Sequence, residues 1–246
     1  MIYNIDVKSL EWCSYLQLSQ DKVGIEEWNA VLQDSKKNDI HKANQEAFSL
    51  PSRLISKVFL FRWIYRGSAF AYAHDPDFTP VSTSVQFWQD VIERYYSKYQ
   101  GIYNTHMLYI KQATQTGIII SPFGREHKFT PRQTYEGLMY NESDITNHPN
   151  QGLGADVVAI ARVVAFERMK KAKIESKLIS TVHDSIVLDG PSNELEVVAY
   201  LFDKIFRDLP KLITNYFNVK WTVPLRAEVK YGPNMTNLEE LVLDLA

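Results

Sequence analysis

Residues 180–189, STVHDSIVLD, place a histidine and an aspartate between two mostly apolar runs. The runs at 179–182 and 186–188 are typical of strands, whereas aspartate is a poor strand former and a buried charge is costly unless something compensates it. The pattern predicts a hairpin with Asp184 in its tight turn. Any fold for this chain must therefore offer that carboxylate either an ordinary turn position or a compensating cation.

Strands and helices are interspersed along the rest of the chain. We expect strands at residues 2–7 and 224–229 and a further hairpin at 116–133, with a proline and a glycine in its turn. Helical patterns occupy 51–65, 85–99, 103–114 and 151–171, and a capping box at Asn193 and Glu196 predicts another helix ending near 209. Because hairpins rather than regular βαβ units connect the strands, the sequence predicts an α+β fold.

Composition excludes several classes of protein. The 246 residues can bury a real core, and 45% hydrophobic with 23% charged residues are ordinary globular values. A net charge of -2 gives no global attraction for nucleic acid, so any such binding must use local basic patches. The single cysteine, Cys13, excludes a disulfide framework, and no apolar run approaches the roughly 18 residues of a membrane helix. We expect a cytoplasmic protein.

The expected helix at 51–65 carries a stripe of chemically useful side chains. Arg53, Lys57, Phe61 and Tyr65 follow one another every four residues and therefore share one slowly drifting face. The two cations near the helix N-terminus suit a triphosphate, and the two rings suit a base or sugar. Taken alone, the stripe is equally typical of a solvated basic face with core aromatics.

Two aspartates lie at expected strand ends, Asp6 after the first strand and Asp184 in the hairpin turn. If the fold brings them together they repel, unless divalent cations hold them. Two metal ions about 4 Å apart can activate a hydroxyl and neutralise a phosphoryl-transfer transition state. Oxygen ligands of this kind select Mg²⁺ or Mn²⁺. Taken singly, each aspartate is equally an ordinary turn residue and His183 a packed histidine.

Two further stretches suit nucleic acid. The basic hairpin arm at 125–128 fits phosphate contacts, and the Asn and Gln side chains of NHPNQG, residues 147–152, can read minor-groove acceptors that all base pairs share. By itself, NHPNQG indicates only a loop and the start of a helix.

Together and in this order, five stretches resemble the polymerase half of the family A DNA polymerases, the DNA polymerase I family, and its tailed-phage branch most closely. DVKSLE at 6–11 resembles the first palm motif, and VHDS at 182–185 the second. DIH at 39–41 resembles the triphosphate-contacting histidine element, and RLISKVFLFRWIY at 53–65 the fingers helix R-x3-K-x3-F-x3-Y. NHPNQGLGAD at 147–156 resembles the N-x-P-x-Q-G segment. The resemblance covers nearly the whole chain.

The resemblance implies a role for each matching residue. Asp6 and Asp184 are the implied catalytic ligands of two Mg²⁺ ions, with Mn²⁺ possible and the Val7 carbonyl assisting. Glu11 and Tyr65 are implied to exclude a 2′-hydroxyl, and Phe61 to disfavour dideoxynucleotides. The implied dNTP-binding residues are Glu11, His41, Arg53, Lys57, Phe61 and Tyr65. The implied contacts to primer–template DNA are Arg125, Asn147, Gln151 and His183.

The implied fold is a right-hand polymerase remnant. Residues 1–20 and 141–246 would form the palm, a mostly antiparallel sheet with helices, and residues 21–140 helical fingers. The thumb and the 3′–5′ exonuclease domain, which precede the first palm motif in the family, have no counterpart in these residues. We therefore expect a split polymerase, or a fragment of one, whose partner polypeptide supplies both domains, in the cytoplasm of a bacterial host if phage-encoded.

The implied activity is template-directed transfer of a nucleotide from a dNTP to a primer 3′-hydroxyl. The alternative is a catalytically inactive nucleic-acid-binding or scaffold subunit, and whether the template is DNA or RNA stays open. Two departures bear on the choice. Arg66 stands where the family usually has glycine, and Ser185 stands where it usually has glutamate, although that glutamate is not an essential metal ligand in the family.

Overall fold

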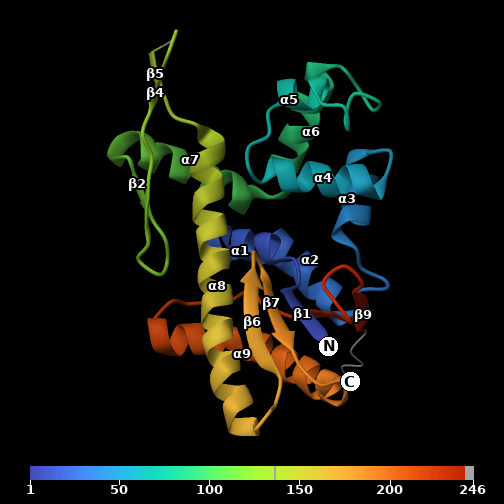
Figure 1. Ribbon diagram of the computed structural model, residues 1–246. Helices are drawn as coiled ribbons and strands as arrows, with labels where there is room; N and C mark the ends of the chain where they lie inside the picture. The colour runs from blue at the N-terminus through green and yellow to red at the C-terminus, as the bar shows by residue number, and fades with distance from the viewer. Residues whose placement is uncertain (136, 242–246) are drawn as a thin grey trace. The chain divides into compact units, whose positions relative to one another are not determined.

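The structure is a computed structural model that describes residues 1–135 and 137–241 (Figure 1). Its contacts divide the chain into two compact units, one formed by Met1–Ser14 with Gln151–Ala246 and the other by Tyr15–Asn150. The assignment of 1–20 and 141–246 to a palm and of 21–140 to fingers remains an interpretation, and residues 242–246 of that range lie outside the described residues. None of the described helices combines the length and apolar character needed to cross a bilayer.

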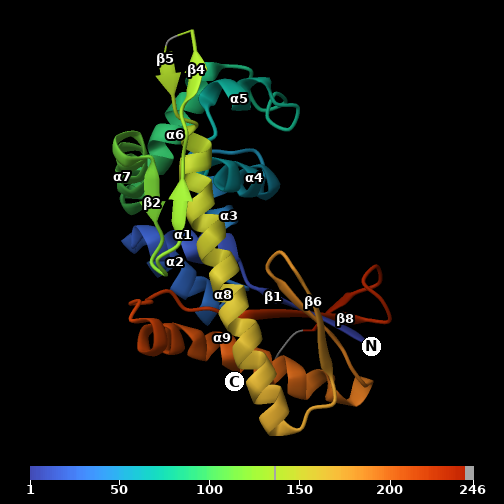
Figure 2. The ribbon, with the colours of Figure 1, turned by 60° about the vertical axis from the view of Figure 1, so that its left-hand side comes forward.

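The first unit contains an antiparallel five-stranded sheet in the order β6-β7-β1-β8-β9. The strands are β1 (Ile2–Val7), β6 (Lys177–Val182), β7 (Ser185–Asp189), β8 (Ala227–Gly232) and β9 (Glu239–Leu241). Tyr3, Ile5 and Val7 alternate into the core from β1, as one buried sheet face requires. Helix α9 (Leu195–Phe217) packs against β1 and β8 (Figure 2). The predicted α+β fold is confirmed.

Helices α1 (Leu10–Ser19) and α8 (Glu142–Ala172) continue from the first unit into the second. Gly154 of α8 lies close to α1, because a Cβ at that position would be 3.3 Å from Cδ2 of Leu10. A 3-10 turn, η1 (Ser192–Glu194), precedes α9, which has no side-chain cap, so the predicted capping box at Asn193 is wrong. The predicted end near 209 is also wrong. Pro210 lies inside α9, where its amphipathic packing outweighs the lost hydrogen bond.

The second unit is a bundle of short helices around buried aromatic rings. The rings of Phe59 and Tyr72 stack 4.6 Å apart, and those of Trp63 and Tyr95 lie 5.2 Å apart. The helices are α2 (Lys22–Gln33), α3 (Ile40–Phe48), α4 (Arg53–Trp63), α5 (Ala69–His74), α6 (Val85–Lys98) and α7 (Gln100–Thr116). Side-chain oxygens of N-cap residues accept first-turn N–H bonds in five of them, as this residue class does.

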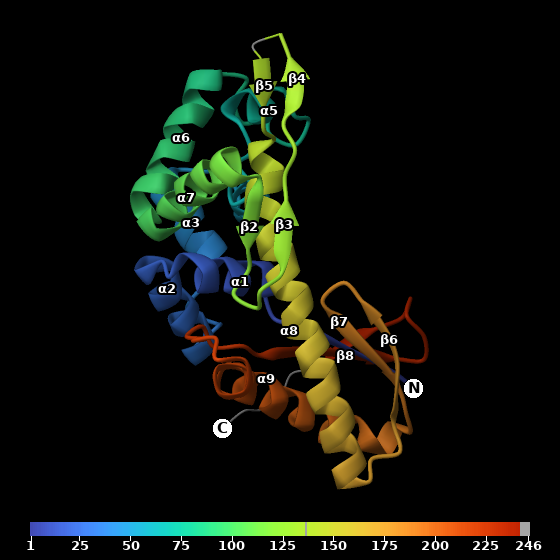
Figure 3. The same cartoon turned by 90° about the vertical axis from the view of Figure 1, so that its left-hand side faces the viewer.

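Two hairpins follow α7 (Figure 3). The predicted one pairs β2 (Ile118–Ile120) with β3 (Glu126–Lys128). A second, which the sequence pattern did not indicate, pairs β4 (Arg132–Thr134) with β5 (Gly137–Met139). Helix α8 then begins at Glu142, nine residues before the expected start, with Pro149 inside it. Acidic residues in the first turn favour this earlier start, and the NHPNQG stretch is therefore helix rather than loop.

Candidate active site

One candidate metal ligand lies at the end of β1 and the other in the turn that leads into the neighbouring strand β7, both in the first unit. Asp6 of β1 pairs in register with Ser185 of β7, and Asp184 is the residue before it. The N–H of Val7 reaches the carbonyl of Asp184 at 3.4 Å. Antiparallel pairing across the middle of the sheet thus brings together residues that are 178 positions apart in the chain.

The hairpin turn consists of His183 and Asp184 alone, since Val182 pairs with Ser185. His183 has a φ of 54°, the left-handed conformation that two-residue hairpin turns use. Two-residue turns project their side chains away from the ladder, so a charged residue is tolerated there. The turn prediction for Asp184 therefore agrees with the observed hairpin.

Asp6 is held by two neighbours. Asn4, two residues earlier on the same strand face, donates through Nδ2 to both carboxylate oxygens at 3.2 and 3.3 Å. The Lys230 ammonium of β8 lies 3.4 Å from Oδ2. Neither residue was predicted as a site residue. The alternation Asn4–Asp6 was the available signal for Asn4, whereas the Lys230 contact depends on the register of β8.

The residues present fit a magnesium site. Asn4 is almost fully buried beside Asp6, and its Oδ1 has no hydrogen-bond partner. Buried acceptors normally have a partner, and a metal-bound water would supply one here. Within residues 1–135 and 137–241 no group of three or more His, Cys, Asp or Glu side chains could hold a metal ion. Mg²⁺ is nevertheless commonly bound by one or two carboxylates plus water and substrate phosphates.

Glu11 lies in the first turn of α1, and its carboxylate accepts a hydrogen bond of 2.7 Å from the Gln151 side chain on α8. The two residues were predicted to contact the sugar and the minor groove respectively. The structure brings them together, so a change at either one would also disturb the other.

In the second unit, the predicted triphosphate-binding residues lie near one another. Arg53 and Lys57 are exposed on α4, and the His41 ring of α3 lies 6.0 Å from the Phe61 ring. Arg53 is not free, because its Nε donates to Asp39 at 2.6 Å. Burial opposes ionisation of Asp39, but hydrogen bonds from the Lys42 N–H and from Arg53 outweigh it, so the Asp39 pKa is lowered.

Burial, together with the positive charges of Arg53 and Lys57, lowers the pKa of His41 to about 4, against the opposing effect of Asp39. His41 is therefore neutral at physiological pH. Its Nδ1 is buried and lacks a hydrogen-bond partner. A neutral imidazole can approach a phosphate oxygen only through a ring N–H donor.

Tyr65 lies just beyond the end of α4, and its hydroxyl accepts a hydrogen bond of 3.1 Å from the Asn150 side chain on α8. The predicted helix at 51–65 therefore ends two residues early. Asn150 is buried and was not predicted as a site residue, although it lies within the NHPNQG stretch. Its neighbour Asn147 also lies on α8, with Oδ1 buried and unpaired.

Arg66 now has a structural explanation. It adopts φ = 60°, the left-handed conformation at a helix end that explains the glycine usual in the family. Its guanidinium donates to the Glu142 carboxylate at the start of α8. The next residue, Gly67, has to be glycine for a different reason: its backbone lies close to the Tyr72 side chain, and a Cβ there would be 2.5 Å from the Tyr72 hydroxyl.

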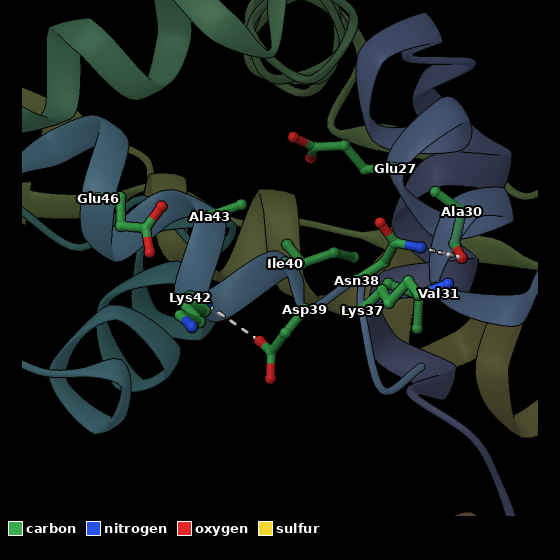
Figure 4. Close-up of a pocket in the computed structure, with 10 residues that line it drawn as sticks. All are labelled: Glu27, Ala30, Val31, Lys37, Asn38, Asp39, Ile40, Lys42, Ala43 and Glu46. Atoms are coloured by element: carbon green, nitrogen blue, oxygen red, sulfur yellow. Dashed lines mark hydrogen bonds between the residues drawn. The ribbon is translucent and has the colours of Figure 1, made fainter. Parts of the chain in front are cut away.

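Arg125 is exposed at the β2–β3 turn, where its N–H donates to Ser121 Oγ at 3.1 Å. A separate cavity of about 270 Å³ lies beside α2 and α3 and includes Asp39 in its wall (Figure 4). The wall mixes acidic and basic side chains and contains none of the predicted nucleotide-binding residues. We assign no nucleotide to this cavity.

Comparison with known proteins then decides the family. Residues 1–237 match the sequence model described as DNA polymerase family A. The chain belongs to DNA polymerase family A. This confirms the family suggested by the five motifs, while the tailed-phage branch and the separate partner remain proposals.

Among family A relatives, the chain is 23% identical over 238 residues to DNA polymerase I of Geobacillus stearothermophilus, covering 95% of this chain and 26% of that protein. It is 23% identical over 216 residues to the DNA polymerase of Bacillus phage SP01, covering 84% and 23%. The fold is similar to a POL domain from M. smegmatis in complex with DNA primer-template and dNTP, with a TM-score of 0.73, 22% identity and coverage of 94% and 39%. The chain thus spans about a quarter of the length of these curated relatives.

Proposed function

We propose that the chain is the catalytic part of a template-directed DNA polymerase. The observation that carries the proposal is that Asp184, in the β6–β7 turn, directly precedes Ser185, the residue paired with Asp6 on the neighbouring antiparallel strand of a family A chain. Two Mg²⁺ ions, or Mn²⁺, bound by these carboxylates with the Val7 carbonyl would activate the primer hydroxyl and neutralise the leaving pyrophosphate. The role of the two carboxylates themselves would be to bind these cations through their negative charge.

The remaining candidates take up substrate roles. We assign the triphosphate to His41, Arg53 and Lys57, whose mutual proximity in the second unit supports a shared anion. Phe61 and Tyr65 would lie beside the base, and Glu11 beneath the sugar. Primer–template DNA, which the M. smegmatis structure contains, would contact the remaining candidates: Arg125, Asn147, Gln151 and His183.

A primer-extension assay tests the proposal, with Asp184→Asn as the decisive variant. We expect a loss of about a thousandfold or more in rate, about 4 kcal/mol of transition-state stabilisation. Asp189→Asn, at the far end of the strand β7 that follows Asp184 and 61% exposed, is the matched control and should stay within about twofold. The assay is run with and without the polypeptide that carries the thumb.

The alternative function, an inactive DNA-binding or scaffold subunit, predicts a different result in this assay. In that case primer–template DNA binds equally to wild type and Asp184→Asn, and neither extends the primer under any of these conditions. That result would overturn the enzymatic proposal.

We further propose that a separate polypeptide supplies the thumb and the 3′–5′ exonuclease, that the chain belongs to the tailed-phage branch, and that it acts in the cytoplasm. An apolar groove of about 800 Å³ on α8 and α9 supports the need for a partner, with Val163 62% and Tyr216 80% exposed. We expect Val163→Glu to abolish co-purification with the thumb-bearing polypeptide. Val197→Glu, an equally exposed valine of α9 outside the groove, is the control. Equal retention of both variants contradicts the partner proposal.

A further inference from the structure

The polar face of the central strands carries an ordered set of charges around Asp6. Asn4 and Asp6 alternate onto one face of β1, Lys8 follows directly after the strand, and the register places Asn4 opposite Lys230 and Asp6 opposite Glu228. Like charges directly opposite each other are unfavourable, and here the acids are instead compensated diagonally. Lys230 reaches Asp6 at 3.4 Å, and Lys8 reaches Glu228 at 3.8 Å.

The Asp6–Lys230 ion pair is weak enough for a divalent cation to replace the lysine ammonium at the carboxylate. Asp6 has a side chain only 16% exposed, whereas that of Lys230 is 44% exposed. Lysine carries a point charge on a flexible stem, so its ammonium can leave the carboxylate for water at small cost. An exposed ion pair of this kind is worth about 0.2–1 kcal/mol, a few-fold in an equilibrium constant, and therefore yields to a divalent cation without blocking it.

Asn4 holds the carboxylate in a different way. Its neutral amide donates to both oxygens of Asp6 and brings no positive charge. It therefore fixes the carboxylate without repelling a cation. The unpaired Oδ1 of the same buried side chain leaves an acceptor for a metal-bound water.

We propose that Lys230 competes with the divalent cation for Asp6 and sets the metal concentration at which the site fills, while Asn4 keeps the carboxylate in position during the exchange. The inference rests on the proposed function, because it takes Asp6 as a metal ligand. It adds two positioning residues, Asn4 and Lys230, that act on the metal through Asp6.

The test measures Mn²⁺ binding directly. The full 246-residue chain is titrated with Mn²⁺ at fixed ionic strength, and the free Mn²⁺ is measured by electron paramagnetic resonance. Lys230→Met should lower the Mn²⁺ dissociation constant about three- to tenfold, because it removes both the ion pair and a nearby positive charge. Lys230→Arg should bind as wild type does. Asn4→Ala should raise the dissociation constant about two- to fivefold, the opposite sign, because the carboxylate loses its fixed orientation.

Lys8→Met is the matched control, since it removes the same charge from the same face but from a lysine paired with Glu228. Its effect should stay below about twofold, because a charge farther from Asp6 is more strongly screened. An effect equal to that of Lys230→Met would show a general field and overturn the contact proposed here. Thermal unfolding of each variant confirms that the compared chains are folded.

Asp6→Asn separates the two levels of failure. If Asp6→Asn loses Mn²⁺ binding but Lys230→Met binds as wild type does, competition by Lys230 is wrong and the proposed function stands. If Asp6→Asn binds Mn²⁺ as wild type does, the metal site at Asp6 and the proposed function both fail. Undetectable binding by wild type and Lys230→Met alike contradicts both as well.

Discussion

At the scale of the residue, Arg53, one of the cations assigned to the triphosphate, is already engaged. Arg53 of α4 donates to Asp39 at 2.6 Å, and the Asp39 carboxylate also caps α3 by accepting hydrogen bonds from the backbone N–H groups of His41 and Lys42. Arg53 must leave this carboxylate before it can bind a triphosphate. The same aspartate therefore has a structural role and a competitive one.

These two roles can be separated by substitution, because asparagine caps a helix as well as aspartate does but carries no charge. We expect Asp39→Asn to lower the KM for dNTP about two- to fivefold in primer extension, the value of a largely exposed ion pair. Asp39→Ala should release Arg53 equally but lose about 1 kcal/mol of stability with the cap. An unchanged KM in Asp39→Asn would show that Arg53 does not bind the triphosphate.

At the scale of the element, the C-terminal end of α4 is fixed by an arginine in a position that favours glycine. The left-handed conformation costs a residue other than glycine about 1 kcal/mol, and the ion pair with Glu142 offsets it. The strain and the contact belong to the same residue. A single substitution at Arg66 therefore changes the backbone strain and the ion pair at the same time.

A double-mutant cycle measured by urea unfolding separates the two effects. Alone, Arg66→Gly should change the free energy of unfolding by less than about 0.5 kcal/mol, because the relieved strain and the lost ion pair nearly cancel. In a Glu142→Gln background, where the charge pair is absent, Arg66→Gly should stabilise by about 1 kcal/mol. Equal effects in both backgrounds would mean that Glu142 does not compensate Arg66.

At the scale of the whole molecule, buried histidines make the fold sensitive to acid. His106 of α7 is fully buried between the Ile64 carbonyl, 3.0 Å from Nε2, and the Tyr96 hydroxyl, 2.9 Å from Nδ1. Burial, together with the charge of Arg66, lowers its pKa to about 3. His41 has its pKa lowered to about 4.

The sign of the pH effect follows from these values. Between pH 6.5 and about 3 the unfolded chain binds more protons than the folded one, so stability is full above pH 6.5 and falls as the pH falls. Each such histidine contributes up to about 1.4 kcal/mol per pH unit. We expect His106→Gln to flatten this slope in urea titrations, whereas the exposed His74 should leave it unchanged when replaced by Gln. An unaltered slope in His106→Gln would contradict a neutral buried His106.

The local pattern of the chain by itself predicted most of the helices and strands and indicated the candidate site residues. The apolar runs around Asp184 and the strand before Asp6 were predicted because alternation and turn residues act over a few positions. The stripe on α4 and the five motifs similarly indicated the family, which the comparisons confirmed. The start of α8 and the length of α9 were mispredicted, because proline and glycine signals are local while helix packing is not.

Only the tertiary structure decided which side chains meet. Lys230 reaches Asp6 because β8 pairs with β1 in one register, and a shift of one residue would turn it to the other face. Arg66 finds Glu142, and Tyr65 finds Asn150, across 76 and 85 positions. Contacts between such distant residues depend on how whole elements pack, which no short stretch of sequence encodes. The sequence therefore predicted which residues carry the chemistry, and the packing decided which neighbours hold them.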